Sequence, residues 1–160
     1  MGLTEHQAAR IWEERAEAEV RSLYFADLAA SDVRLKQIIN GVSFFLSSGA
    51  AATVVAKLPS AIPVGLALVA ALAMAYSIAV NLDKRAAALV KLHCQWNHLS
   101  MDYEGLWNHW YEDGAEETLR GLQKRASEAS ELGIEMPYKE NLIEKWSSRV
   151  YSRLRPATTQ

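Results

Sequence analysis

The chain has 160 residues, a length that suffices for one domain with a modest core, and its formal net charge is −2. The sequence contains no strongly basic stripe, so its charge pattern excludes a dedicated nucleic-acid surface. Cys94 is the only cysteine, which excludes an intramolecular disulfide and is typical of proteins in a reducing compartment.

Charged residues are concentrated at the two ends of the chain. Residues 1–37 carry seven acidic and five basic side chains, and residues 83–160 carry twelve acidic and eleven basic ones. Residues 38–82 carry a single charge, that of Lys57. We therefore expect one domain over residues 1–160, in which two polar parts flank an apolar one.

Residues 1–37 predict an amphipathic N-terminal helix. Thr4 and Gln7 form the pattern of a capping box, and the residues that follow place apolar side chains at spacings of three and four. The pattern continues through about residue 30, and Ser31-Asp32 is compatible with a new helix start or with one long helix. The first thirty residues lack the features of a signal peptide, so membrane insertion would have to use the internal segment.

Two uncharged runs follow, Ile38–Ala56 and Ala61–Leu82, with only four residues between them. A helix rises about 1.5 Å per residue, so a run of roughly 20 residues reaches the ~30 Å of a hydrocarbon core. We therefore predict an all-α fold with a two-transmembrane helical hairpin over residues 38–82. The alternative is a hairpin buried in a soluble bundle. The flanking helices are too polar and too few to surround two helices that are apolar on every side, which favours the membrane.

Basic residues near the ends of the two runs predict the orientation of the hairpin. Lys57 is alone in the loop, whereas the terminal sides carry Arg34, Lys36, Lys84, Arg85 and Lys91. Because positive residues stay inside, we expect a multi-pass protein of the inner (plasma) membrane with both termini in the cytoplasm.

Residues 83–160 predict a long cytoplasmic helical extension and a polar tail. We expect one helix from about Ala61 to Glu112, a second from about Ala115 to Glu131 and a third from about Lys139 to Leu154. The first contains an apolar seam at alternating spacings of three and four, which predicts a coiled-coil contact and a candidate oligomer seam. Its residues are Leu89, Leu92, Trp96, Leu99, Tyr103, Leu106 and Trp110.

Small and polar residues recur on both predicted spans. They are Asn40, Ser43 and Ser47 on the first span and Ala67, Ala71, Ala75 and Ala79 on the second. They predict either close packing within one hairpin or a polar path lined by several hairpins. A single hairpin cannot enclose a pore, so conduction would require a homo-oligomer.

The sequence offers no catalytic constellation and no distinctive metal motif. Trp96-Asn97-His98 and Trp107-Asn108-His109 repeat the same three residues, but their spacing matches no zinc motif. Neither a glycine-rich phosphate loop nor a nucleophile elbow is present. We predict no enzyme, no cofactor and no metal.

This layout resembles that of the SLATT family, small bacterial two-transmembrane effectors associated with nucleotide-sensing (SMODS and SLOG) anti-phage systems. The resemblance covers most of residues 10–112 and lies in the order of the helices and in their residue patterns. Its parts are the N-terminal amphipathic helix, the hairpin Ile38–Leu82 and the helix that carries Trp96, Leu99, Leu106, Trp107 and Trp110. The resemblance implies a pore-forming or membrane-disrupting effector that arrests or kills an infected cell when a partner signals, and it implies no catalytic residues.

We therefore expect a non-enzymatic effector of antiviral defence that forms an oligomeric pore or disrupts the bilayer. Its expected partners are the lipid bilayer, further copies of the chain and a signalling or sensor protein, but no nucleic acid. Two alternatives stay open at this point. One is a membrane-anchored helical interaction or scaffold module without pore activity, and the other is a soluble helical bundle that oligomerises.

Overall fold

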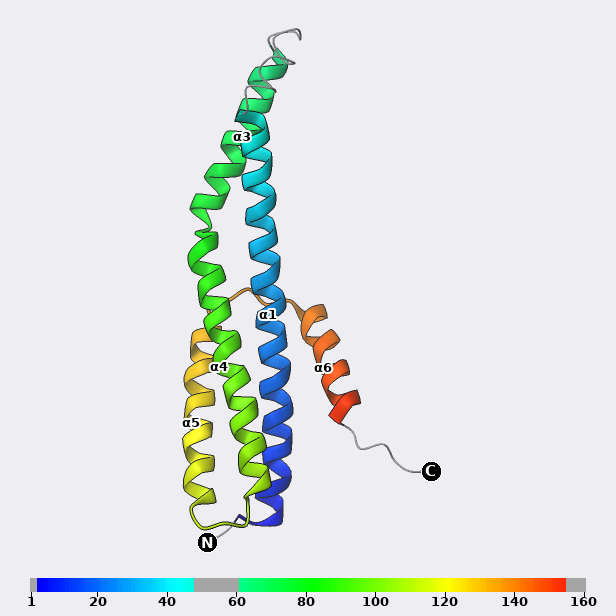
Figure 1. Ribbon diagram of the computed structural model, residues 1–160, viewed down its shortest axis with the longest axis vertical. Coiled ribbons are helices and arrows are strands. Elements are labelled where there is room, and N and C mark those ends of the chain that lie inside the picture. The colour runs from blue at the N-terminus through cyan, green and yellow to red at the C-terminus, as the bar shows by residue number, and fades with distance from the viewer. Residues whose placement is uncertain (1–2, 48–60, 155–160) are drawn as a thin grey trace. The chain divides into compact units, whose positions relative to one another are not determined.

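The computed structural model describes residues 3–47 and 61–154, with only the backbone described at residues 46, 47, 61–64, 66 and 67 (Figure 1). In these residues the protein is entirely helical and has no strand, which confirms the predicted all-α class. The helices are α1 (Glu5–Ser47), α3 (Ala61–Ala79), α4 (Leu82–Asn108), α5 (Ala115–Gly133) and α6 (Glu140–Leu154). The end of the first uncharged run and the loop with Lys57 lie outside the described residues.

The chain divides into two compact units. Unit 1 comprises Met1–Asp27 and Leu89–Gln160, and unit 2 comprises Leu28–Ala88. Unit 1 therefore contains the first part of α1, most of α4, and α5 and α6. Unit 2 contains the second part of α1, α3 and the first turns of α4.

The start of α1 is fixed by the predicted capping box. The backbone N–H of Thr4 donates to Oε1 of Gln7 at 2.8 Å, and the N–H of Gln7 donates to Oγ1 of Thr4 at 3.3 Å. From there α1 continues through Ser31 and Asp32 without interruption. Of the two alternatives for this segment, one long helix is therefore the one observed.

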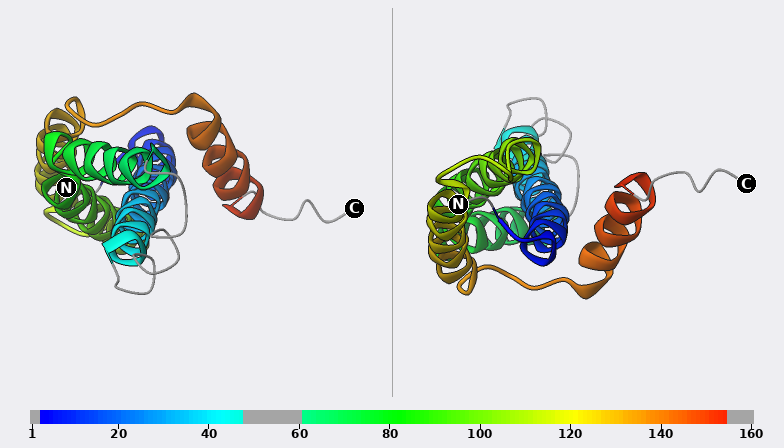
Figure 2. Two further views of the ribbon diagram at one scale, coloured as in Figure 1. Left: turned by 90° about the horizontal axis from the view of Figure 1, so that it is seen from above. Right: turned by 90° about the horizontal axis from the view of Figure 1, so that it is seen from below.

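The core of unit 1 lies between α1, α4 and α5, which run side by side in Figures 1 and 2. The rings of Trp12 on α1 and Trp107 on α4 pack with centroids 5.9 Å apart. Arg125 on α5 contacts Asp102 on α4 at 2.7 Å. The buried side chains of this core alternate at helical spacing along all three helices, as an amphipathic pattern requires. They include Ile11, Ala18, Leu89, Leu99, Leu119 and Leu122.

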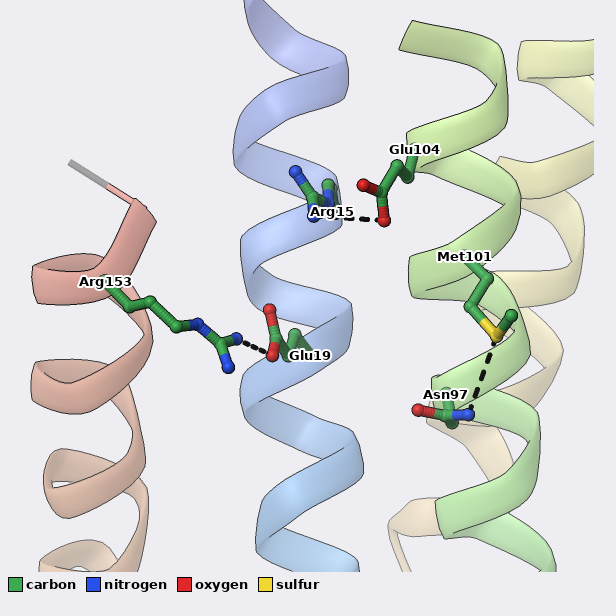
Figure 3. A network of polar contacts seen from close by, with 6 residues as sticks. All are labelled: Arg15, Glu19, Asn97, Met101, Glu104 and Arg153. Atoms are coloured by element: carbon green, nitrogen blue, oxygen red, sulfur yellow. Dashed lines mark hydrogen bonds and ion pairs between the residues drawn. The ribbon is translucent and has the colours of Figure 1, made fainter. Parts of the chain in front are cut away.

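Helix α6 packs on the first part of α1 through a small apolar cluster. Val150 is 1% exposed and lies against Ala16 and Val20. An ion pair between Arg153 and Glu19 borders the cluster, as Figure 3 shows. Leu23, Trp146 and Leu154 are partly buried against the same cluster, so apolar packing holds α6 on α1 and the exposed ion pair adds little.

The predicted long helix from Ala61 to Glu112 is wrong in one respect, because it is interrupted between α3 and α4. Asn81 has φ 48°, a left-handed conformation that ends α3, and α4 begins at Leu82. Asparagine tolerates this conformation better than most residues, because its short polar side chain bonds locally. At its other end α4 stops at Asn108, and Gly114 with φ 90° precedes α5.

None of the described helices is both long enough and apolar enough to cross a bilayer. The predicted transmembrane hairpin is therefore not supported by the part of the chain that the structure describes.

Candidate functional site

The most unusual surface of the described residues lies on unit 2. Large apolar side chains on α1 and α3 point outward there, with exposed fractions between 46 and 78%. Exposed apolar patches mark sites of contact with another molecule or with lipid. We define the unit 2 apolar surface by Ile38, Val42, Phe44 and Phe45 on α1 and Leu68, Val69, Leu72, Met74, Tyr76 and Ile78 on α3.

The predicted alanine stripe of the second span lies on the exposed side of α3. Ala71, Ala75 and Ala79 are exposed, and the side chain of Ala67 lies outside the described residues. The less exposed positions of α3 are instead Ala70, Ala73 and Ser77. The described stripe residues therefore do not lie on the most covered side of α3.

The predicted polar stripe of the first span is only partly described. Asn40 is exposed on α1, whereas the hydroxyl of Ser43 is buried and has no hydrogen-bond partner among the described residues. The side chain of Ser47 lies outside the described residues. A buried hydroxyl without a partner lowers stability by about 1–3 kcal/mol, so a hydrogen bond from Ser43 to a polar neighbour would be favourable. A pore-lining role for this face stays a prediction.

Two ion pairs join α1 to the first turns of α4 within unit 2. Arg85 contacts both carboxylate oxygens of Asp32, at 2.6 Å and 2.5 Å, and Lys36 contacts Asp83. The hydrogen bond to Asp32 raises the pKa of Arg85 above its usual value, against the opposing effect of desolvation. The sequence predicts for Lys36 and Arg85 only a role in orientation, because no local pattern connects residues so far apart in the chain.

The predicted oligomer seam lies inside unit 1. Six of its residues, from Leu89 to Leu106, are at most 6% exposed, and Trp110 is half-buried. The backbone N–H of Leu3 donates to the carbonyl of Trp110 at 2.9 Å, which ties the start of the chain to the end of α4. The heptad pattern is thus satisfied by packing within one chain, and its use between copies stays a prediction.

The two Trp-Asn-His copies place their members differently. Trp96 is buried and Trp107 is half-buried, whereas Asn97, His98, Asn108 and His109 are exposed. His93, near the first copy, contacts the backbone carbonyl of Ser22 through Nδ1 at 3.0 Å. Over residues 3–47 and 61–154, no three His, Cys, Asp or Glu side chains gather in a group that could hold a metal ion.

Comparison of the chain with protein-family models, with curated proteins and with solved structures finds no match. The resemblance to the SLATT family therefore stays a prediction.

Proposed function

We propose that this chain is a non-enzymatic membrane effector that inserts the hairpin of residues 38–82 into a lipid bilayer and permeabilises it as a homo-oligomer. The unit 2 apolar surface carries this proposal. Ten large apolar side chains of the described residues are at least 46% exposed on it. Transfer of apolar surface out of water contributes roughly 25 cal/mol per Å², so covering these side chains with lipid strongly favours the inserted state.

The charge pattern beside this surface supports a bilayer as the occupant. Residues 38–82 carry one charged residue, Lys57, while the paired charges Asp32–Arg85 and Lys36–Asp83 lie just outside the run. Charged groups are costly in hydrocarbon and favourable at its border with water. The excess of basic residues on the terminal side supports cytoplasmic termini at the inner membrane.

The exposed small residues of α3 support assembly of several copies. Without an aqueous driving force between helices, association in lipid depends on close packing, which small side chains permit. Ala71, Ala75 and Ala79 are exposed and spaced four residues apart, so they form one such outward stripe. Asn40, which is exposed on α1, is the polar group that we assign to an aqueous path between copies.

The resemblance to the SLATT family adds a biological setting to this proposal. In that setting the effector acts in antiviral defence, and a sensor protein that detects infection promotes the permeabilisation, which a high concentration of the chain also produces. The proposal includes such a protein as a partner.

Membrane fractionation of bacteria that express the chain tests insertion. We expect the protein in the membrane pellet after a high-salt wash and its release only by detergent. Leu72→Lys places a charge on the unit 2 apolar surface and should shift the protein to the cytosol or to aggregates. Met101→Lys is the matched control, because Met101 is 60% exposed and Leu72 is 62% exposed, but Met101 lies on α4 in unit 1.

Uptake of a membrane-impermeant dye after strong induction tests permeabilisation. We expect uptake with the unchanged chain and with Met101→Lys, and none with Leu72→Lys. A chain that sediments with membranes but leaves them sealed even when overexpressed would instead be an anchored interaction module. A chain that remains in the cytosol without detergent would be a soluble oligomer, and either result contradicts the proposal.

A further inference from the structure

Unit 1 contains an open cavity of about 520 Å³ between α1, α5, the segment after α5 and α6. Cavities of about 300–1,000 Å³ hold organic molecules of the size of cofactors and drugs. The sequence pattern predicts only helix packing in this region, and the membrane proposal does not use the cavity. The cavity is therefore a separate site.

Most of the cavity wall is apolar or aromatic. Phe25 on α1 is 7% exposed, and Ile143 on α6 is half-buried. Tyr138 and Ile134 lie at the wall with exposed fractions of 72% and 80%, although large apolar side chains are usually covered. The rings of Tyr24 and Trp96 complete a surface that suits a flat or aliphatic body.

Among the residues that line the cavity, Arg21 carries the only positive charge. Its guanidinium carbon lies 4.7 Å from the centre of the Trp96 ring, and its Nη1 donates to Oγ of Ser130 at 2.9 Å. Its Nη2 contacts the carboxylate of Glu17. A guanidinium carries five N–H donors, so Arg21 can keep these contacts and still donate to a ligand.

The ring of Trp96 lies behind Arg21 on the same wall. Its side chain is 4% exposed, and its Nε1 is closed off from solvent, so Arg21 is the donor that a ligand in the cavity can reach. A second cavity of about 340 Å³ shares Glu17, Arg21, Trp96 and Ser130 with the first, so these residues border both spaces.

We propose that this cavity binds an amphipathic organic anion. Its ring or chain body would lie against Phe25 and Ile143, and its carboxylate, sulfonate or phosphate would accept from Arg21. The pair Arg21–Glu17 opposes binding only weakly, because its side chains are 40% and 56% exposed and such exposed pairs contribute about 0–1 kcal/mol. The site does not depend on the proposed function.

Binding would also stabilise the position of α6. Ile143 belongs to α6, whereas Phe25 and Arg21 belong to α1, so one ligand contacts both helices. The apolar cluster around Val150 is small, so a ligand that contacts both helices would add substantially to the contacts between α6 and α1. A ligand that binds only when α6 is packed on α1 stabilises that packing by mass action.

The test uses the full chain, in aqueous buffer if it is soluble there and otherwise in nanodiscs of zwitterionic lipid, and two fluorescent probes that differ by one group. The first is 8-anilinonaphthalene-1-sulfonate, and the second is its parent without the sulfonate, N-phenyl-1-naphthylamine. We expect saturable binding of the sulfonate probe above the signal of the same medium without protein, and binding of the parent about tenfold weaker or more. Equal affinity for the two probes, or no saturable component, would overturn the proposal.

Two pairs of variants locate the site. Arg21→Gln should weaken binding of the sulfonate probe about tenfold, whereas Arg120→Gln should leave it unchanged. Arg120 is a matched control because it also pairs with a glutamate four residues before it, at 2.7 Å, but lies away from the cavity.

Variants that fill the cavity test the site without changing Arg21. Ser147→Phe should abolish saturable binding, and Ser148→Phe should not, because only Ser147 lines the cavity. The helical circular dichroism of both variants should match that of the unchanged chain. Undiminished probe binding by a folded Arg21→Gln or a folded Ser147→Phe variant would place the probe elsewhere and refute the site.

Discussion

The guanidinium of Arg85 donates two hydrogen bonds to the carboxylate of Asp32, from Nε to Oδ2 at 2.6 Å and from Nη2 to Oδ1 at 2.5 Å. The pair joins α1 to the beginning of α4 within unit 2, directly after the left-handed residue Asn81. The side chain of Asp32 is only 10% exposed and that of Arg85 is 29% exposed. A bidentate pair with this little exposure is stronger than an ordinary surface pair.

Replacing Asp32 by alanine should therefore destabilise the protein. Asp32→Ala leaves a partly buried guanidinium without its carboxylate, which we expect to lower the free energy of unfolding by about 2–3 kcal/mol. Asp83→Ala removes the exposed pair with Lys36 and should cost less than about 1 kcal/mol. The measurement is the thermal unfolding midpoint of the full chain in detergent, followed by circular dichroism. Equal midpoint shifts for the two variants would contradict the special role of the Asp32–Arg85 pair.

The helices of this protein were largely predictable because local signals mark their ends. The capping box at Thr4 and Gln7 fixes the start of α1, and Gly114 lies at the break before α5, next to where the sequence predicts it. The break at Asn81 was missed. Neither glycine nor proline occurs there, and apolar periodicity continues on both sides. Asparagine permits a left-handed conformation without requiring it, so only the tertiary structure reveals the break.

The surfaces of the helices were less predictable than their ends. The residues from Leu89 to Leu106 form a strict seam, but a seam pattern is the same whether it packs within a chain or between chains. On α3, small residues occur at spacings of three or four on two neighbouring sides, so periodicity could not distinguish Ala71 and Ala75 from Ala70 and Ala73. The cavity beside Arg21 required four separate segments of the chain and had no sequence signal.

Burial of Tyr103 predicts a loss of stability at alkaline pH. Tyr103 is 2% exposed, and burial, reinforced by the carboxylate of Glu14, raises the pKa of its hydroxyl above the usual value. In the unfolded chain this hydroxyl ionises near pH 10, whereas in the folded protein it stays neutral to higher pH. Its contribution to stability is therefore complete below about pH 10 and is lost as the pH rises above that value.

The phenylalanine variant measures this contribution directly. Tyr103→Phe keeps the ring and removes the titration, so its stability should fall less steeply above about pH 10, by up to about 1.4 kcal/mol per pH unit. Tyr111→Phe is the control, because Tyr111 is 65% exposed. Unfolding midpoints of the three proteins between about pH 8 and about pH 11.5 provide the comparison. Parallel curves for the unchanged chain and Tyr103→Phe would rule out this assignment.

Tyr24 holds the segment between α5 and α6. Its hydroxyl donates to the carbonyl of Pro137 at 2.7 Å and accepts from the N–H of Lys139 at 3.0 Å. Tyr24→Phe removes both bonds and should weaken the local attachment by about 1–2 kcal/mol, which corresponds to about five- to thirtyfold faster amide exchange. Hydrogen exchange measured by mass spectrometry on peptides from residues 134–142 gives this ratio.

A matched variant shows whether faster exchange comes from the two lost hydrogen bonds or from the removal of any nearby hydroxyl. Tyr138 belongs to the same segment and is 72% exposed, so Tyr138→Phe should leave the exchange rate unchanged. Exchange in peptides from α4 should be the same in all three proteins. Unaltered exchange at residues 134–142 in Tyr24→Phe would mean that the segment is held by other contacts.

The proposed assembly in the bilayer predicts that Ala75 requires a small side chain. Ala75 is exposed at the middle of the stripe Ala71, Ala75 and Ala79, and isoleucine there would keep neighbouring helices apart. We expect Ala75→Ile to remain in the membrane fraction but to give fewer oligomers on chemical cross-linking and less dye uptake. Met74→Ile is the control, because Met74 is exposed on the same helix but lies outside the stripe. Full cross-linking and uptake with Ala75→Ile would show that copies do not meet along this side of α3, and assembly would then have to use the face of Asn40 on α1.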